Sequence, residues 1–408
     1  MPRASHLLAG VAALALATAV AVAVFGLGGA RTARAATTWP AHVFAPYVDT
    51  GLSNTTLTTV AADYGTKYFS LAFVNGAGCQ WSLPQSGWQS QVSALQAEGG
   101  DVSISFGGYT VDTDGTDLGA QCSSAAAMAA QVESVVTSFN VTHLDFDIES
   151  NQQYDSADLT LTAQALSQVR SWASGNGEQL TISYTIPVLP TGLTSTGESV
   201  LTTALSSGFT PNVVNIMTMD YGSSGTEMGS AANQALAAPA GQLESIYGIS
   251  SAAAYGMLGN TPMIGQNDSP GEIFTLADAS TVESYAAQQG IAMLSFWAEG
   301  RDNGGCPGNT SASSTCSGLS QASGAFTQAF QAFTSGGGNG GGGPTSSPTP
   351  PPTTTPPTGS CSAAWVASQA YVSGNEVSYN GDNWTANQWN YDEVPGGPAG
   401  AWNNDGAC

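Results

Sequence analysis

Short apolar runs rich in β-branched and aromatic residues recur along residues 39–335, with longer and more polar segments between them. Runs of this kind are typical of buried strands, and the intervening segments have the length and composition of helices. Strands that alternate with helices build parallel sheets, because each helix carries the chain back to the start of the next strand. We predict eight strands, at residues 43–48, 68–74, 101–106, 143–148, 179–187, 213–219, 254–264 and 292–297.

Eight strand–helix repeats in one domain predict an α/β fold, the (β/α)8 TIM barrel. In such barrels the catalytic groups lie at the carboxyl ends of the strands, where the strand–helix loops meet. Glu149 falls at the end of the fourth predicted strand, so it is a candidate catalytic residue. The competing architecture is an open, doubly wound parallel sheet, which has the same alternation of strands and helices.

The composition of residues 336–360 predicts a linker. Residues 336–343 are nearly all glycine, and residues 344–358 consist of proline, threonine and serine. A segment of this composition cannot bury a core, so we expect a flexible coil followed by an extended polyproline spacer. The linker divides a large domain, residues 39–335, from a small one, residues 361–408.

The amino terminus has the pattern of an export signal. Arg3 precedes an apolar stretch over residues 7–30, and Ala33-Arg34-Ala35 has the small-x-small pattern after which signal peptidases cleave. We predict a signal peptide over residues 1–35 and a secreted, extracellular protein without membrane contact after cleavage. The apolar stretch is longer than a usual signal core, so an uncleaved membrane anchor is the alternative.

The charge of the chain excludes some partners. Half of the basic residues lie in the predicted signal, which leaves Lys67, Arg170 and Arg301 against 29 acidic residues, a formal charge of 3 − 29 = −26. Such a surface repels nucleic acid and anionic lipid, and it suits a soluble protein that acts on a neutral polymer. An adaptation for solubility would give the same composition.

Six cysteines in an exported chain suggest three disulfides, although the sequence permits 15 pairings. Their order along the chain favours Cys79 with Cys122, Cys306 with Cys316, and Cys361 with Cys408. The cysteines and the three scattered histidines form no cluster with the spacing of a metal site, and we expect no metal.

Residues 143–149 alternate polar and apolar side chains. With a period of two, Asp145, Asp147 and Glu149 point to one face of a strand and the apolar residues to the other. Neighbouring carboxylates resist ionising together, so at least one should keep a proton near neutral pH, as a general acid requires. An exposed strand with solvent-facing acids is the simpler alternative, but a parallel strand is covered on both faces. The run lacks the glycine of an EF-hand loop, and a sugar-nucleotide transferase would lack its donor outside the cell.

Three further motifs occur near strand ends. They are Ser105-Phe106-Gly107-Gly108, Met217-Thr218-Met219-Asp220-Tyr221 and Ser295-Phe296-Trp297. Together with the DxDxE run of Asp145, Asp147 and Glu149 they resemble, in order, the third-, fourth-, sixth- and eighth-strand motifs of glycoside hydrolase family 18, the chitinases and their relatives. Thr142 and His143 replace the Asp-Gly that usually precedes DxDxE.

The resemblance implies a substrate-assisted mechanism, in which the 2-acetamido oxygen of the substrate is the nucleophile. Glu149 then protonates the glycosidic oxygen and later activates water. Asp147 hydrogen-bonds the acetamido N–H, and Asp145 biases the position and charge of Asp147. The expected reaction is hydrolysis of β-1,4 bonds between N-acetylglucosamine units of chitin, with retention at the anomeric carbon and without a cofactor.

The resemblance also implies a cleft. Trp297 would stack under the distorted sugar, with a core tryptophan as the plainer alternative. Asp220, Tyr221, Met217 and Met219 are expected to line the same cleft. Met219 stands where the family has a tyrosine that contacts the acetamido carbonyl, and methionine cannot donate that hydrogen bond. Tyr221 shares strand parity with Met219 and could supply the hydroxyl.

Residues 265–291 leave no room for the α+β insertion that tunnel-forming members of the family carry between the last two strands. We therefore expect an open groove and an endo-acting, poorly processive enzyme. The implied partners are chitin and N-acetylglucosamine oligomers, and we expect a monomer. Two other functions remain open: a non-catalytic chitin-binding lectin, and an endo-β-N-acetylglucosaminidase that acts on N-glycans.

The small domain is rich in aromatic residues. Four of the nine tryptophans of the chain lie in residues 361–408, which is more than a core of that size needs. The segment resembles the short, mostly β chitin-binding modules of families 5 and 12. By that resemblance Tyr379 or Trp384 forms an exposed platform together with Trp389, while Trp365 and Trp402 pack inside.

Overall fold

The computed structural model describes residues 39–52, 55–336, 361–366, 370–371, 375–386, 390–391, 394–397 and 401–408. The predicted signal peptide and all of the predicted linker except Gly336, which ends a helix, lie outside these ranges. Within the ranges, no helix is both long enough and apolar enough to cross a membrane.

A parallel sheet forms the centre of the large domain, with its strands side by side almost in sequence order. The strands are β1 (Val43–Phe44), β2 (Tyr47–Asp49), β3 (Tyr68–Val74), β4 (Asp101–Gly107), β5 (His143–Asp147), β6 (Thr181–Pro187), β7 (Val213–Met217), β8 (Leu258–Thr261) and β11 (Met293–Leu294).

The sheet closes through its first strand, which Pro46 divides into β1 and β2. β1 pairs with β11 and β2 pairs with β3, both in parallel. Proline has no N–H for a ladder bond, yet the bonding continues on both sides of it. The N–H of Ala45 donates to the carbonyl of Leu294 (2.9 Å), and that of Tyr47 to the carbonyl of Phe296 (3.0 Å). The two segments are one strand of an eight-stranded barrel, so the predicted TIM barrel is confirmed and an open sheet is excluded.

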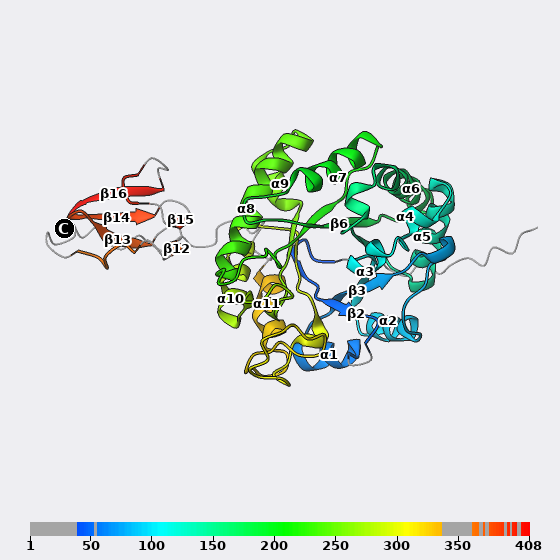
Figure 1. Cartoon of the computed structure of the whole chain (residues 1–408), viewed down its shortest axis with the longest axis horizontal. Helices are drawn as coiled ribbons and strands as arrows, with labels where there is room; N and C mark the ends of the chain where they lie inside the picture. Colours follow the sequence, from blue (N-terminus) through cyan, green and yellow to red (C-terminus); the bar gives the residue numbers. More distant parts are fainter. Residues whose placement is uncertain are drawn as a thin grey trace, which may run out of the picture. The chain divides into compact units, whose positions relative to one another are not determined.

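Helices surround the barrel (Figure 1). They are α1 (Leu57–Tyr64), α2 (Trp88–Ala97), α3 (Tyr109–Thr113), α4 (Leu118–Gln121), α5 (Ala125–Phe139), α6 (Ser156–Gly175), α7 (Ser195–Ser206), α8 (Met228–Tyr247), α9 (Ser251–Gly256), α10 (Leu276–Gln289) and α11 (Ala325–Gly336), with 3-10 turns η1 (Ala77–Cys79), η2 (Gln152–Tyr154) and η3 (Glu299–Arg301). A short hairpin, β9 (Gly265–Gln266) with β10 (Ile273–Phe274), precedes α10.

Strand β5 shows why the chain folds this way. Leu144 and Phe146 belong to the hydrophobic core, and Phe146 stacks on Phe106 of β4 with ring centroids 4.6 Å apart. Such a pair contributes about 0.5–1.5 kcal/mol beyond its buried area. The opposite face of β5 carries Asp145 and Asp147. The alternation in the sequence therefore separates an apolar layer under the helices from a polar barrel interior.

Several predicted strands are longer than those observed. The largest difference is at residues 254–264, whose first residues belong to α9, with strand β8 restricted to Leu258–Thr261. Ala254 is fully buried on that helix, so its apolar character reflects packing of α9 and not a strand. Short apolar segments of helix and strand look alike in sequence, because both are buried on every side.

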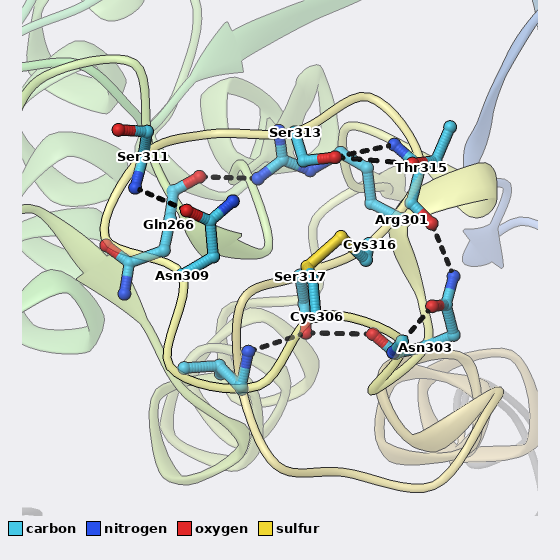
Figure 2. Close-up of a disulfide and its surroundings, with 12 residues drawn as sticks. Gln266, Arg301, Asn303, Cys306, Asn309, Ser311, Ser313, Thr315, Cys316 and Ser317 are labelled. Atoms are coloured by element: carbon cyan, nitrogen blue, oxygen red, sulfur yellow. Dashed lines mark hydrogen bonds between the residues drawn. A yellow bond between two sulfur atoms is a disulfide. The ribbon is translucent and has the colours of Figure 1, made fainter.

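The three disulfides are those that the order of the cysteines favours. They are Cys79–Cys122, Cys306–Cys316 and Cys361–Cys408. Figure 2 shows the second of these in the loop between η3 and α11. In the same loop the Asn303 side chain donates to the carbonyl of Thr315 (2.8 Å), and the Ser317 hydroxyl donates to the carbonyl of Asn303 (3.1 Å). Both bonds bridge the two arms of the loop that the disulfide joins.

The described part of the small domain is all β. Strands β13 (Glu376–Tyr379), β14 (Asp382–Ala386) and β16 (Trp402–Ala407) form an antiparallel sheet, and β12 (Ala370–Tyr371) pairs with β15 (Asn390–Tyr391). A separate small core contains Tyr371, Val377, Ala386, Ala401 and Trp402.

Candidate active site

The three acids of the DxDxE run lie at the carboxyl end of β5. Asp145 and Asp147 point into the barrel and are 1% and 4% exposed. Glu149 lies two residues beyond the strand, at the rim of the barrel, and is half-buried. The arrangement places a single accessible carboxyl above two buried ones.

Four hydroxyl groups surround the carboxyl of Asp145. Tyr47 and Ser105 donate to Oδ2 at 2.8 and 2.7 Å, and Ser183 and Thr185 donate to Oδ1 at 2.6 and 2.8 Å. Burial raises the pKa of Asp145, and the four hydrogen bonds oppose that increase. Ser105, Ser183 and Thr185 come from the neighbouring strands β4 and β6, and Tyr47 reaches the carboxyl from β2, so the barrel itself fixes Asp145.

Asp147 has a different environment. Its Oδ1 is buried and has no hydrogen-bond partner among the described residues. Burial raises the pKa of Asp147 well above its usual value, and repulsion from Glu149, Asp145 and Asp112 adds to that increase. The environment of Asp147 therefore favours its protonated form, in the direction expected for neighbouring acids that resist ionising together.

Glu149 has the protonation properties of a general acid. Burial raises its pKa to about 7, the backbone N–H of Tyr109 opposes that increase, and the nearby charge of Asp220 adds to it. A carboxyl that is half-protonated at neutral pH and open to solvent can donate a proton to a bound molecule and take one back from water.

Two glycines allow the end of β4 to approach the acids. Gly107 pairs with Asp147 in the sheet and has φ +88°, and a Cβ there would collide with the carbonyl oxygen of Asp147. Gly108 has φ +85°, and a Cβ there would lie 2.7 Å from the ring of Phe73. Both conformations disfavour other residues, so the SxGG motif is required by the close packing.

An aromatic group lies at the last strand. Trp297 is half-buried and stacks on Phe73 with centroids 5.5 Å apart. It also lies 6.0 Å from the ring of Tyr47, whose hydroxyl contacts Asp145. Trp297 is thus partly exposed and not a fully buried core residue, with one chain of contacts linking it to the acids.

The end of β7 carries the remaining predicted cleft residues. Met217 is buried, Met219 is half-buried and Asp220 is exposed. Asp220 raises the pKa of Glu149, so the two carboxyls are close. Tyr221 packs against the core, and its hydroxyl is buried with no hydrogen-bond partner among the described residues.

The hairpin before α10 holds this loop in place. The buried Glu272 carboxylate accepts the backbone N–H groups of Tyr221 (2.9 Å) and Ser223 (2.8 Å). The carboxylate of Asp220 accepts the N–H of Ser269 (2.7 Å). These bonds fix the backbone that carries Asp220 and Tyr221.

Asp302 and Arg301 have structural partners. Asp302 accepts the N–H groups of Phe326 (3.0 Å) and Thr327 (2.7 Å), which caps the start of α11. Arg301 donates to the carbonyls of Ile264 and Gln266, and Figure 2 draws the second of these bonds. Each side chain therefore ties one loop to the next.

The aromatics predicted to form a platform in the small domain are only partly described. Tyr379 and Trp384 are half-buried, and Trp384 Nε1 donates to the carbonyl of Tyr379 (3.2 Å). Trp402 is buried against Tyr371, as predicted, while Trp365 is half-buried. Trp389 lies outside the described residues.

Three residues that contact the site were missed in the sequence. Tyr47 donates to Asp145, Phe73 stacks on Trp297, and Asp112 accepts the backbone N–H of Glu149. Tyr47 and Phe73 lie near the carboxyl ends of predicted strands, and this position could have marked them as candidates. Asp112 lies beyond a predicted strand, and nothing in the sequence marked it. Across the described ranges, no group of three or more His, Cys, Asp or Glu side chains could hold a metal ion.

The sequence has clear relatives. The profile of glycosyl hydrolases family 18 matches residues 41–393. A protein of Escherichia coli (strain K12) named "Probable bifunctional chitinase/lysozyme" is 35% identical over 319 residues, which cover 72% of this chain and 35% of that protein. "Endochitinase 11" of Metarhizium anisopliae is 34% identical over 281 residues, covering 65% of this chain and 53% of that protein. The chain spans about a third of the first relative and about half of the second.

Solved structures are similar in sequence and fold. Catalytic-site mutants of active domain 2 of a chitinase from Pyrococcus furiosus are 32% identical with a TM-score of 0.67, covering 74% of this chain and 98% of that one. The catalytic domain of the hyperthermophilic chitinase of the same organism, also 32% identical, has a TM-score of 0.65 and the same coverage. Because the matching profile spans most of the sequence and includes the barrel with its acidic strand end, this chain belongs to family 18 of the glycosyl hydrolases.

Proposed function

We propose that this protein is a secreted, endo-acting chitinase, which hydrolyses β-1,4 bonds between N-acetylglucosamine units with retention at the anomeric carbon. The observation that carries the proposal is Glu149, a half-buried carboxyl at the barrel rim with a pKa raised to about 7. Relatives and solved structures with chitinase in their names support the choice of substrate.

The arrangement of the three acids favours substrate assistance. Most glycosidases use a second carboxyl as nucleophile or base. Here Asp145 is fully buried and its two oxygens accept four hydroxyl donors, while Asp147 is buried and burial raises its pKa well above the usual value. Neither acid offers an exposed anionic nucleophile. An acetamido oxygen supplied by the substrate would fill that role, and the partnerless oxygen of Asp147 is available to the acetamido N–H.

The rest of the proposal rests on the sequence. The small domain has the aromatic content and the small β sheets of a chitin-binding module, which would hold the barrel near insoluble polymer. The pattern of residues 1–35 supports export. A formal net charge of −23 for the whole chain suits an uncharged polysaccharide better than an anionic polymer.

Replacing Glu149 by glutamine tests the proposal. The amide keeps the shape of the side chain but has no acidic proton to transfer to the leaving group, so we expect turnover of soluble chitin oligomers to fall by about 10²–10⁴-fold. Binding to insoluble chitin should stay within about twofold, because the other contacts remain. Glu299→Gln is the matched control, since that buried acid bonds to Thr327 of α11 and its loss should leave turnover unchanged.

Each other outcome identifies a different function. Binding of chitin without turnover by the unmodified protein would indicate a lectin. Release of N-glycans from glycoproteins in preference to cleavage of chitin oligomers would indicate an endo-β-N-acetylglucosaminidase. Equal rates on deacetylated polymer, or products of inverted configuration, would exclude substrate assistance.

A further inference from the structure

On the side of β4, the hydrogen bonds of strand β5 end at Asp147, two residues before Glu149. The last bond between β4 and β5 on this side runs from the N–H of Gly108 to the carbonyl of Asp147 (2.9 Å). The carbonyl of Gly108, which would come next in the ladder, accepts instead the N–H of Asp112 (3.0 Å) inside helix α3. The N–H of Glu149 is therefore left without a strand partner.

The side chain of Asp112 takes the place of that partner. Its Oδ2 accepts the N–H of Glu149 at 2.7 Å, and the side chain is 1% exposed. The next two residues are held by the same helix, because the hydroxyl of Thr113 donates to that of Ser150 (2.8 Å) and the side chain of Asn151 donates to the carbonyl of Thr113 (2.9 Å). Ser150 has φ +42°, so the chain turns sharply at this point.

The second oxygen of Asp112 is unusual. Oδ1 is buried and has no hydrogen-bond partner among the described residues. The charged groups that face it are all acids: Asp117 of the loop before α4, Asp158 of α6, and Glu149 and Asp147 of the β5 end. Burial raises the pKa of Asp112 to about 9; the hydrogen bond from the Glu149 N–H opposes that increase, and the charges of Asp117, Glu149 and Asp158 add to it. At neutral pH the carboxyl is uncharged, yet its carbonyl oxygen still accepts the Glu149 N–H.

We propose that Asp112 is a positioning residue for Glu149: its carboxyl completes the β4–β5 ladder where the strand ends and fixes the main chain that carries the acid. The inference rests on the proposed role of Glu149. A carboxyl that is displaced by about 1 Å from its reacting position loses about 10²-fold in rate. Burying a carboxyl with one unpaired oxygen destabilises the fold. The need to hold the main chain of Glu149 in place explains why Asp112 is nevertheless found at this position.

The test compares two replacements of Asp112. Asp112→Ala removes the acceptor, and we expect kcat on soluble chitin oligomers to fall by about 10–100-fold with KM within about threefold. Asp112→Asn keeps a carbonyl oxygen in the same place and matches the uncharged acid in shape, so kcat should recover to within about threefold of the unmodified enzyme. Asp112→Ser, which keeps a small polar group but cannot reach Glu149, replaces the alanine variant if that variant does not fold.

Asp278→Ala provides the control. Asp278 is also a buried acid that accepts backbone N–H groups, from Gly229 (3.1 Å) and Thr275 (2.6 Å), but on helix α10. The Asp278→Ala substitution should lower the melting temperature and leave kcat within about twofold of the unmodified enzyme. Unchanged kcat in a folded Asp112→Ala, an asparagine variant as slow as alanine, or an equal kcat loss in Asp278→Ala would each overturn the inference. If Glu149→Gln remains active, the proposed function itself fails.

Discussion

In the proposed mechanism, the proton of Glu149 sets the pH range in which the site can work. Burial raises its pKa to about 7, so the acid keeps its proton up to neutral pH and loses it above. Because a general acid acts only in its protonated form, kcat/KM should fall as the pH rises through about 7.

Asp220→Asn tests the electrostatic part of that pKa. The negative charge of Asp220 disfavours ionisation of Glu149, so its removal should lower the pKa and move the alkaline limb of the kcat/KM profile to lower pH. Asp220 is exposed, so we expect a shift of roughly a few tenths of a pH unit, and a smaller one in high salt. Asp63→Asn, an exposed acid on α1, should not move the limb. A shift of the Asp220 variant to higher pH would contradict the assignment.

The acids of β5 could be predicted from the sequence, and Asp112 could not. Asp145 and Asp147 share a period of two within β5, and Glu149 continues that period two residues past the strand end, so the sequence pattern brings the three acids to one end of the barrel. Asp112 belongs to a short helix between two strands, and its contact with Glu149 depends on how the Gly107–Gly108 turn directs that helix.

The elements of the barrel were predicted in number and order, but not at their ends. The apolar run that predicts the seventh strand begins inside α9, before β8. The apolar composition of a segment indicates that it is buried, but strand ends, short helices and rim loops are all buried. Hydrogen bonding, which defines the elements, is set by the neighbouring strand.

The connection between β8 and β11 bears on the mode of cutting. It consists of the β9–β10 hairpin and α10, without a further domain, and Glu149 and Trp297 are both partly exposed. We therefore expect internal bonds to be cut at random. The viscosity of a soluble chitin derivative should fall steeply while few reducing ends have formed. A slow fall in viscosity with abundant dimer from the first minutes would contradict an endo mode.

The stability of the complete chain should depend on pH through its buried acids. Burial raises the pKa of Asp112 to about 9, and those of Asp158 and Glu299 to about 8. Unfolded, such acids have pKa values of about 4, so the folded state binds more protons than the unfolded state between pH 4 and 8. The stabilisation of the folded state by these protons is complete below about pH 4, and it is lost as the pH rises through the pKa values of the folded acids.

The melting temperature should therefore be several degrees higher at pH 5 than at pH 8, measured by thermal unfolding at matched ionic strength. Repulsion within a chain of net charge −23 acts in the same direction. Glu299→Gln, which cannot ionise, should show a smaller difference between the two pH values. A melting temperature that is equal or higher at pH 8 would show that these acids are already ionised in the folded state.

The closure of the barrel through its divided first strand has a consequence for biosynthesis. The Ser295 hydroxyl donates to the carbonyl of Ala45, 250 residues earlier, and the ladder beside it joins the same two segments. A ribosome must finish nearly the whole barrel before its first strand gains a second neighbour, and contacts so distant along the chain form slowly. Until then the nascent protein has two open sheet edges, which makes a chaperone most valuable late in translation and a chain truncated before β11 prone to aggregate.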